Sequence, residues 1–247
     1  MSRHVPAISL LAGLLSGLVL ACTCCAQSVP DAARSRAAIA RTKTGLMARL
    51  RGQELTWGAP LFIRIFKHER RLEVWLRQGR QFRLFKVYPV CTSGGRGPGP
   101  KTTRGDGRAP EGFYAVGPAR MNPYSRFHLA FNLGYPNAYD RAHGRTGGGL
   151  MVHGRCVSIG CFAMGDKAME EIYALADAAL RGGQRFFRVH IFPFEMTAAN
   201  LARQRGSVWF DFWCNLKQGY DLFEAQAVPP VVRVRNRRYV LEPGCDP

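Results

Sequence analysis

The chain has 247 residues and a formal net charge of +18, because 35 Lys and Arg residues face only 17 Asp and Glu residues. A charge this large suggests an anionic partner. The arginines are scattered through expected strands and loops instead of being gathered on one motif, which argues against nucleic acid. The length suits one domain with terminal additions.

The amino terminus has the pattern of an export signal. A short basic start at Met1–His4 precedes an apolar run over 5–21 and then small residues and cysteines. We interpret residues 1–26 as a secretory signal peptide cleaved after Ala26. A loose lipoprotein pattern would instead end before Cys22, and an uncleaved anchor of roughly 17 residues would be short for a membrane span. Export is expected, and lipidation stays open.

Export to the periplasm or cell envelope makes cysteine pairing informative, since that compartment is oxidising. Cleavage after Ala26 would leave an odd number of cysteines, so one thiol must stay unpaired within the chain. The others can form up to two disulfides, and Cys214 with Cys245 is one plausible pair. The five cysteines are Cys91, Cys156, Cys161, Cys214 and Cys245. Outside the cytoplasm, the positive charge suits an anionic polymer or a membrane surface, or is simply a basic solvated surface.

The next elements expected along the chain are a helical segment and then a β-sheet. Residues 27–58 are expected to form a helical amino-terminal arm, since 31–50 is rich in Ala and Arg. Apolar and polar residues then alternate over 61–66, 72–76 and 82–88, which predicts half-buried strands joined as antiparallel hairpins. A sheet that repeatedly turns back on itself begins a sandwich or barrel.

A Gly- and Pro-rich loop over 93–112 follows. Its sequence nearly matches that of a phosphate-binding loop. However, Pro100 stands where a glycine should precede Lys101, and proline has no N–H to donate. We therefore expect no nucleotide there. Two further strands are predicted over 112–116 and 127–132. The polar loop over 134–149 could then form a wall of a site.

The segment 149–161 carries the strongest chemical signal. An apolar run over 149–152 predicts a buried strand that ends at His153, and Cys161 follows Gly160 in a turn. A thiol needs a neighbouring base to become a thiolate at neutral pH. Packing of a buried cysteine is the plain alternative. Zinc, with His143 and Cys156 as further ligands, is disfavoured by the spacing, so neither a metal nor a cofactor is expected.

The carboxyl-terminal part adds helices and a hairpin. Asp166 is expected to cap a helix with one apolar face that ends at Gly182-Gly183, and 187–192 returns as a strand. Aromatic residues over 209–223 recur at helical spacing and are expected to belong to the core. A hairpin around Asn236 is expected within 231–241.

These residues together resemble a known family. The run His153–Met164 contains a Ser-x-Gly-Cys turn preceded by His-Gly; Asp106–Tyr114 lies upstream, and Tyr139-Asp140-Arg141 lies between them. The combination resembles the L,D-transpeptidase catalytic domain, also called the YkuD domain, in its YafK-like branch. The resemblance implies a mainly β, sandwich-like domain over 59–195 with flanking helices, followed by a helical and hairpin extension over 196–247.

The resemblance also implies roles for particular residues. Cys161 matches the nucleophile and His153 the base, whereas His143 satisfies the longer spacing of the broader family and is the alternative base. Ile159 stands where many members have a histidine. The backbone N–H groups around Gly160 and Cys161 would hold the oxyanion. The remaining site residues are Gly154 in the catalytic segment and Arg145, Arg155, Ser158 and Tyr139 as substrate contacts.

The function implied is acyl transfer in the cell envelope. The expected substrate is the peptidoglycan stem peptide, attacked at the L,D-amide of meso-diaminopimelate to give a thioester on Cys161. An amine acceptor would give a cross-link, and water would make the enzyme an amidase that releases a wall-linked lipoprotein or peptide. A wall-binding module without catalysis is a further alternative. Association with a membrane would follow from lipidated Cys22 or from an uncleaved anchor.

Overall fold

The computed structural model describes Met1, residues 28–95 and residues 97–244. The expected signal segment beyond Met1, with Cys22, lies outside these residues, and so does Cys245 of the proposed Cys214–Cys245 pair. Among the helices that the structure describes, none is long and apolar enough to cross a membrane.

The main sheet has five strands in the order β3-β2-β1-β9-β4. Its central strands β1 and β9 run parallel, and the other neighbours are antiparallel. The predicted hairpins β1–β2 and β2–β3 are confirmed. The strands span Leu61–Phe66 (β1), Arg71–Gln78 (β2), Gln81–Pro89 (β3), Gly112–Val116 (β4) and Phe187–Phe192 (β9).

A second sheet carries the segment around Cys161. Its order is β5-β6-β7-β8, with β7 parallel to β8. Phe131, Val152 and Phe162 from this sheet share one buried core with the main sheet. The expectation of a mainly β fold with helical additions is therefore confirmed. The strands span Met121–Asn122 (β5), Ala130–Asn132 (β6), Met151–His153 (β7) and Phe162–Ala163 (β8), and the 3-10 turn η1 spans Pro118–Arg120.

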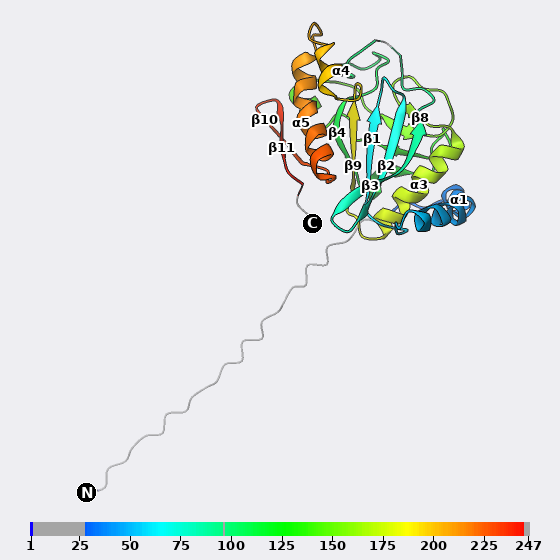
Figure 1. The fold of residues 1–247 in the computed structure, drawn as a ribbon. Helices are drawn as coiled ribbons and strands as arrows, with labels where there is room; N and C mark the ends of the chain where they lie inside the picture. The colour runs from blue at the N-terminus through cyan, green and yellow to red at the C-terminus, as the bar shows by residue number, and fades with distance from the viewer. Residues whose placement is uncertain (2–27, 96, 245–247) are drawn as a thin grey trace.

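Helices cover both faces of the main sheet, as Figure 1 shows. The long helices α1 and α3 pack together on one side, and α5 lies on the other side with the β10–β11 hairpin. Coverage of both faces explains why all six residues of β1 are buried. The remaining elements are α1 (Ala33–Gly52), α2 (Ala138–Ala142), α3 (Asp166–Arg181), α4 (Ala198–Ala202), α5 (Phe210–Gln226), β10 (Val231–Arg235) and β11 (Arg238–Glu242).

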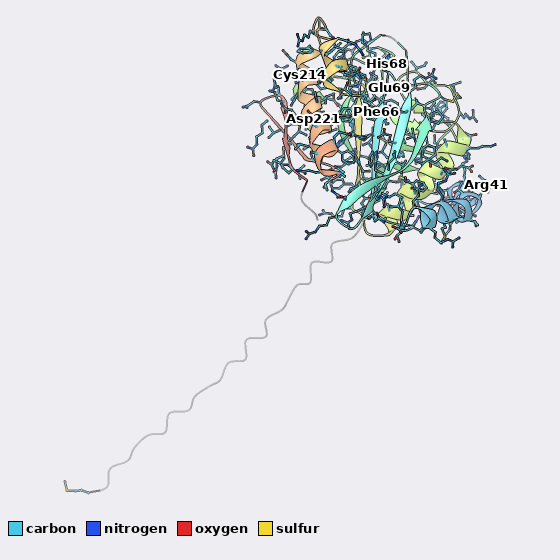
Figure 2. All side chains as sticks on the ribbon, viewed as in Figure 1. Arg41, Phe66, His68, Glu69, Cys214 and Asp221 are labelled. Atoms are coloured by element: carbon cyan, nitrogen blue, oxygen red, sulfur yellow. A yellow bond between two sulfur atoms is a disulfide. The ribbon has the colours of Figure 1, made fainter. Side chains whose placement is uncertain are left out.

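The aromatic face of α5 lies in the core, as predicted. Phe66 on β1 faces the helix that carries Cys214 and Asp221 (Figure 2), and it belongs to the same buried cluster as Trp213 and Leu216. Burying such side chains stabilises the fold by about 1.5–3 kcal/mol each. The extension after residue 195 is therefore attached through a core of its own.

The start of α3 differs from the expectation. Gly165 occupies the N-cap position with a φ of 75°, and Asp166 is the first helical residue. Its carboxylate accepts a hydrogen bond from the backbone N–H of Arg155 instead of capping its own helix. Asp166 thus ties α3 to the loop between β7 and β8.

Candidate active site

Cys161 is the residue immediately before β8, and it lies beside β7. Its thiol is not in a disulfide and is half-buried. The Sγ atom lies 3.7 Å from the carbonyl oxygen of Gly149. Since Val152 pairs with Phe162, the parallel register places the cysteine alongside the first residue of β7. A reactive group is thereby fixed at the junction of two strands.

His153 ends β7 and is 2% exposed. Its Nδ1 atom lies 2.6 Å from the carbonyl oxygen of Gly154, so Nδ1 must carry the proton and donate. In the described residues, Nε2 has no hydrogen-bond partner, which leaves its lone pair able to accept a proton. The ring also packs on Phe127, with centroids 4.7 Å apart. This arrangement fixes both the tautomer and the orientation that a general base requires.

Burial shifts the two groups in opposite directions. It raises the pKa of the Cys161 thiol, although the backbone N–H of Met151 and the charge of Lys101 act to lower that pKa. It lowers the pKa of His153, against a smaller opposing effect of the Gly154 carbonyl. Both shifts favour a neutral thiol and a neutral imidazole.

Lys101 is a contributor that the sequence did not reveal as part of this site. Its ammonium group donates to the Asp106 carboxylate and to the Thr103 carbonyl, each at 2.8 Å. Burial acts to raise the pKa of Asp106, but the hydrogen bond from Lys101 and those from backbone N–H groups bring it to about 2. The contacts with Asp106 and Thr103 fix the position of the ammonium group that acts on the Cys161 sulfur. From the sequence alone, Lys101 was notable only as part of an incomplete match to a phosphate-binding loop.

The turn before Cys161 is closely packed against the Gly-rich loop. Gly160 has a φ of 99°, and a Cβ there would meet the Arg108 carbonyl oxygen at 2.8 Å. A Cβ on Gly94 would come within 2.7 Å of the Gly160 nitrogen. Neither the Gly160 nor the Cys161 N–H donates to an acceptor within the described part of the chain. These amides are therefore available for a developing oxyanion.

Three other predicted residues shape the loop between β7 and β8. The Ser158 hydroxyl donates to the Cys161 carbonyl oxygen at 2.8 Å. A Cβ on Gly154 would meet the Asp166 carboxylate at 2.7 Å. Arg155 has a φ of 55°, and its side chain is exposed. Ser158 and Gly154 thus stabilise the conformation of the loop, whereas the Arg155 side chain points to solvent.

A disulfide between Cys91 and Cys156 anchors the same loop, with a Cα–Cα distance of 5.4 Å. It joins the chain after β3 to the segment between His153 and Cys161. The sulfur of Cys156, considered above as a zinc ligand, is thus bonded to another sulfur. In the described residues, no group of three or more His, Cys, Asp or Glu side chains is placed to hold a metal.

Arg145, Tyr139 and His143 lie together in a different cluster. Arg145 is buried and donates to Asp140 at 2.8 Å, which gives its guanidinium an internal partner in place of the substrate carboxylate that we expected. Tyr139 is buried and stacks on His143 with centroids 4.3 Å apart. The Nε2 atom of His143 lies 2.8 Å from the carbonyl oxygen of Arg237. The Cys161 thiol lies instead against Gly149, just before β7, and against Met151, the first residue of the strand that ends at His153.

Comparison with known proteins identifies relatives of this chain. The model of the L,D-transpeptidase catalytic domain, YkuD, matches residues 60–191, just over half of the chain. YafK of Escherichia coli (strain K12), whose name assigns it provisionally to the L,D-transpeptidases, is 48% identical over 184 residues. That alignment covers 74% of this chain and 74% of YafK. The same identity and coverage are found for YafK of Escherichia coli O157:H7.

Solved structures with a similar arrangement are more distant. The helical cell shape determining protein Pgp2 from Campylobacter jejuni is 22% identical, with a TM-score of 0.45 over 68% of this chain. The match covers 59% of Pgp2, so this chain spans less than two thirds of its length. Bd1075 from Bdellovibrio bacteriovorus is 19% identical, with a TM-score of 0.40, over 72% of this chain and 78% of that chain.

Proposed function

The chain belongs to the YkuD family of L,D-transpeptidase catalytic domains, and we propose that it is a cysteine acyltransferase of the cell envelope that acts on peptidoglycan stem peptides. The bond attacked is the L,D-amide of meso-diaminopimelate. The observation that carries the proposal is a free Cys161 thiol beside β7, whose last residue, His153, holds its proton on Nδ1. Export through residues 1–26 would bring the enzyme to its substrate.

The reaction begins with transfer of the Cys161 thiol proton to Nε2 of His153 as sulfur attacks the amide carbon. The carbonyl oxygen becomes negative and is held by the N–H groups of Gly160 and Cys161. When the C–N bond breaks, the departing amine takes the proton from His153, and a thioester remains on Cys161. An amine acceptor or water then attacks the thioester and restores the thiol.

The test is to incubate the purified protein with a tetrapeptide muropeptide, with and without an added amine acceptor, and to follow products and the Cys161 peptide by mass spectrometry. We expect a thioester adduct on Cys161, and cross-linked product only where the amine is present. Hydrolysed product in both reactions would identify an amidase instead. Cys161→Ala should form neither adduct nor product.

Cys214→Ala is the matched control, because it removes the other free, half-buried thiol in the described residues, which lies on α5. It should retain full turnover. If the unmodified protein forms no adduct and no product with wall-derived or lipoprotein-linked stems, yet still binds them, the enzyme proposal is wrong and a wall-binding module is favoured.

A further inference from the structure

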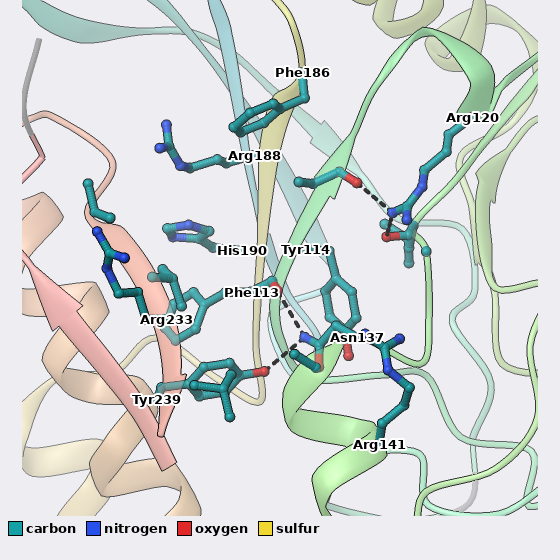
Figure 3. A pocket seen from close by; sticks show the side chains of 17 residues that line it. Phe113, Tyr114, Arg120, Asn137, Arg141, Phe186, Arg188, His190, Arg233 and Tyr239 are labelled. Atoms are coloured by element: carbon teal, nitrogen blue, oxygen red, sulfur yellow. Dashed lines mark hydrogen bonds between the residues drawn. The ribbon is translucent and has the colours of Figure 1, made fainter. Parts of the chain in front are cut away.

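A cavity lies on the face of the main sheet opposite α3. It has a volume of about 560 Å³ and is bounded by β4, β9, α2 and the β10–β11 hairpin. Figure 3 shows its side chains in close view. It shares no described residue with the Cys161 site, and Arg188 and His190 of β9 line it while Val189 and Ile191 point into the core on the other face. The cavity is therefore separate from the proposed reaction.

His190 is the first unusual group in this cavity. It is 1% exposed, and neither ring nitrogen has a hydrogen-bond partner in the structure. The edges of Phe62 and Phe113 enclose the ring, each with centroids 4.7 Å from it. A buried polar group without a partner is destabilising, because it has lost its hydrogen bonds to water and gained none in the protein. Such a group is rare in folded proteins unless a ligand or water completes its hydrogen bonds.

Arg188 is the second unusual group. It is half-buried, and its guanidinium contacts the Phe186 ring at 5.4 Å, but within the described residues it forms no hydrogen bond or ion pair. Burial alone lowers its pKa, with no carboxylate acting on it. Buried charges in proteins are normally paired. Figure 3 shows the His190 ring between Arg188 and Phe113.

Three other arginines at the cavity add positive charge, and one of them, Arg233, has an acidic partner. Arg120 donates to the carbonyl oxygens of Ala115 and Leu133, and Arg233 lies 3.8 Å from Glu242. Arg141 is exposed at the rim. Among the described residues that line the cavity, none is acidic. The lining thus combines a positive field, the unpartnered imidazole of His190, a half-buried guanidinium without a protein partner among the described residues, and an apolar wall from Phe113 and Phe186.

We propose that this cavity binds a small ligand through a carboxylate or phosphate group held by Arg188 and His190. The guanidinium supplies two parallel N–H donors, which match the oxygens of either group. The imidazole supplies one further N–H. The aromatic wall then receives the apolar or sugar part of the ligand. This role does not depend on the acyl transfer proposed for Cys161.

Calorimetric titrations of the full chain with inorganic phosphate and with N-acetylalanine separate the two sources of the anionic group. Ionic strength is held constant with NaCl, because a net charge of +18 attracts anions everywhere. We expect saturable binding of one to one stoichiometry by at least one of the two. N-acetylalaninamide, which lacks the carboxylate, should not bind. If neither anion shows saturable binding, the proposal is overturned.

Arg188→Gln should weaken binding by about tenfold or more, since a charged hydrogen bond is lost. Arg51→Gln is the matched control, because Arg51 is exposed at the end of α1 and the charge change is the same. Equal losses in both variants would mean that the general surface charge binds the anion, and would overturn the proposal.

A measurement on the unaltered protein guards against a variant that fails to fold. Phenylglyoxal labelling, followed by peptide mass mapping, reports the accessibility of each arginine. The bound anion should slow labelling of Arg188 and leave labelling of Arg51 unchanged. An Arg188 labelling rate that saturating anion does not alter would contradict the site.

Discussion

At the scale of single residues, burial favours the neutral form of both the Cys161 thiol and the His153 imidazole. A raised thiol pKa and a lowered imidazole pKa both oppose a standing thiolate and imidazolium pair. In the reaction proposed for Cys161, proton transfer should then accompany the attack on the substrate instead of preceding it. The resting thiol would consequently be protected from nonspecific electrophiles.

The pH dependence of Cys161 alkylation tests this directly. Because the thiol pKa is raised above its ordinary value, the thiolate fraction should keep rising through the alkaline range, about tenfold per pH unit below the pKa. We expect the iodoacetamide rate, localised to Cys161 by mass spectrometry, to level off at higher pH than for a cysteine model peptide. A rate that is flat from pH 6 to 8 would indicate a preformed ion pair instead.

Lys101 should tune that thiol through its charge. Lys101→Met removes the cation that lowers the pKa of Cys161, so alkylation at pH 8 should slow by roughly two- to tenfold and its pH profile should move upward. Backbone N–H groups from Thr102 and Thr103 still satisfy Asp106. Lys101→Arg should restore much of the rate. Lys167→Met, at an exposed position on α3, should leave the profile in place.

At the scale of elements, the Cys91–Cys156 disulfide should hold the loop between β7 and β8 in its reactive geometry. Strand β8 has other ties, since the Cys91 N–H donates to the Ala163 carbonyl and the Ala163 N–H to that of Thr92, each at 2.9 Å. The loop has fewer. Its cross-link spans a sequence separation of 65 residues, for which about 2–4 kcal/mol of stabilisation is typical.

Cys91→Ala/Cys156→Ala should therefore lower Tm and also reduce kcat/KM well below the melting range, by about tenfold for a loosened nucleophile loop. Enzyme assays and thermal unfolding on the same samples separate the two effects. Unchanged kcat/KM in the double variant would mean that Asp166 and the Gly94–Gly160 contact suffice to hold the loop.

Arg64 joins α5 to the main sheet. Its guanidinium donates to Glu73 at 2.8 Å and to Glu224, and it lies 4.8 Å from the ring centroids of Trp75 and Phe223. Arg64→Met would remove one of the two guanidinium partners of the buried Glu73 carboxylate and leave Arg71, which donates to Glu73 at 3.2 Å. The free energy of unfolding should therefore fall by about 1–3 kcal/mol.

The double variant Arg64→Met/Glu73→Gln tests the source of that cost. The Gln carbonyl can still accept from the Trp75 indole N–H, which lies 2.9 Å from Glu73 in the unaltered protein. Denaturant unfolding should show that the double variant loses less stability than the sum of the two single variants. Simple additivity would show that the aromatic contacts of Arg64, not the ion pair, carry the cost.

At the scale of the whole molecule, local patterns predicted most elements but not the partnerships between distant ones. Alternation in 61–66 and 82–88 predicted strands correctly, but β1 is buried on both faces instead of half-buried because helices cover both faces of the sheet. The aromatic spacing of α5 correctly predicted that this face lies in the core. No local pattern pairs β1 with β9 or Cys91 with Cys156, since both depend on closure of long loops.

The candidate site divides in the same way. The position of Cys161 next to the strand that ends at His153 could be predicted, because the two residues are close in sequence and flanked by strand and turn signals. The role of Arg145 could not, because its partner Asp140 is revealed only when the chain is folded. The effect of Lys101 on Cys161 and the lack of a hydrogen-bond partner for His190 also depend on tertiary contacts. The sequence therefore does not reveal the roles of residues whose contacts are made with residues distant along the chain.

The stability of the whole fold should depend on pH through its buried histidines. Burial, with Arg188 and Arg64 nearby, holds the pKa of His190 far below its ordinary value. In the unfolded chain this histidine binds a proton below about pH 6.5, whereas in the folded chain it stays neutral. The unfolded state then binds more protons, so the free energy of unfolding must fall with falling pH, at a limiting slope of about 1.4 kcal/mol per pH unit.

Urea unfolding between pH 7.0 and 5.5, in a buffer without phosphate or carboxylate, measures this slope. Buried carboxyls such as Asp140 and Asp177, whose pKa burial raises, change stability in the opposite direction. The decisive quantity is therefore the difference between the unaltered protein and His190→Leu, in which the contribution of His190 is absent while that of His153 remains. We expect the slope to be smaller in the variant. Equal slopes would show that His190 gains its proton as readily in the folded chain as in the unfolded one, and that its burial does not keep it neutral.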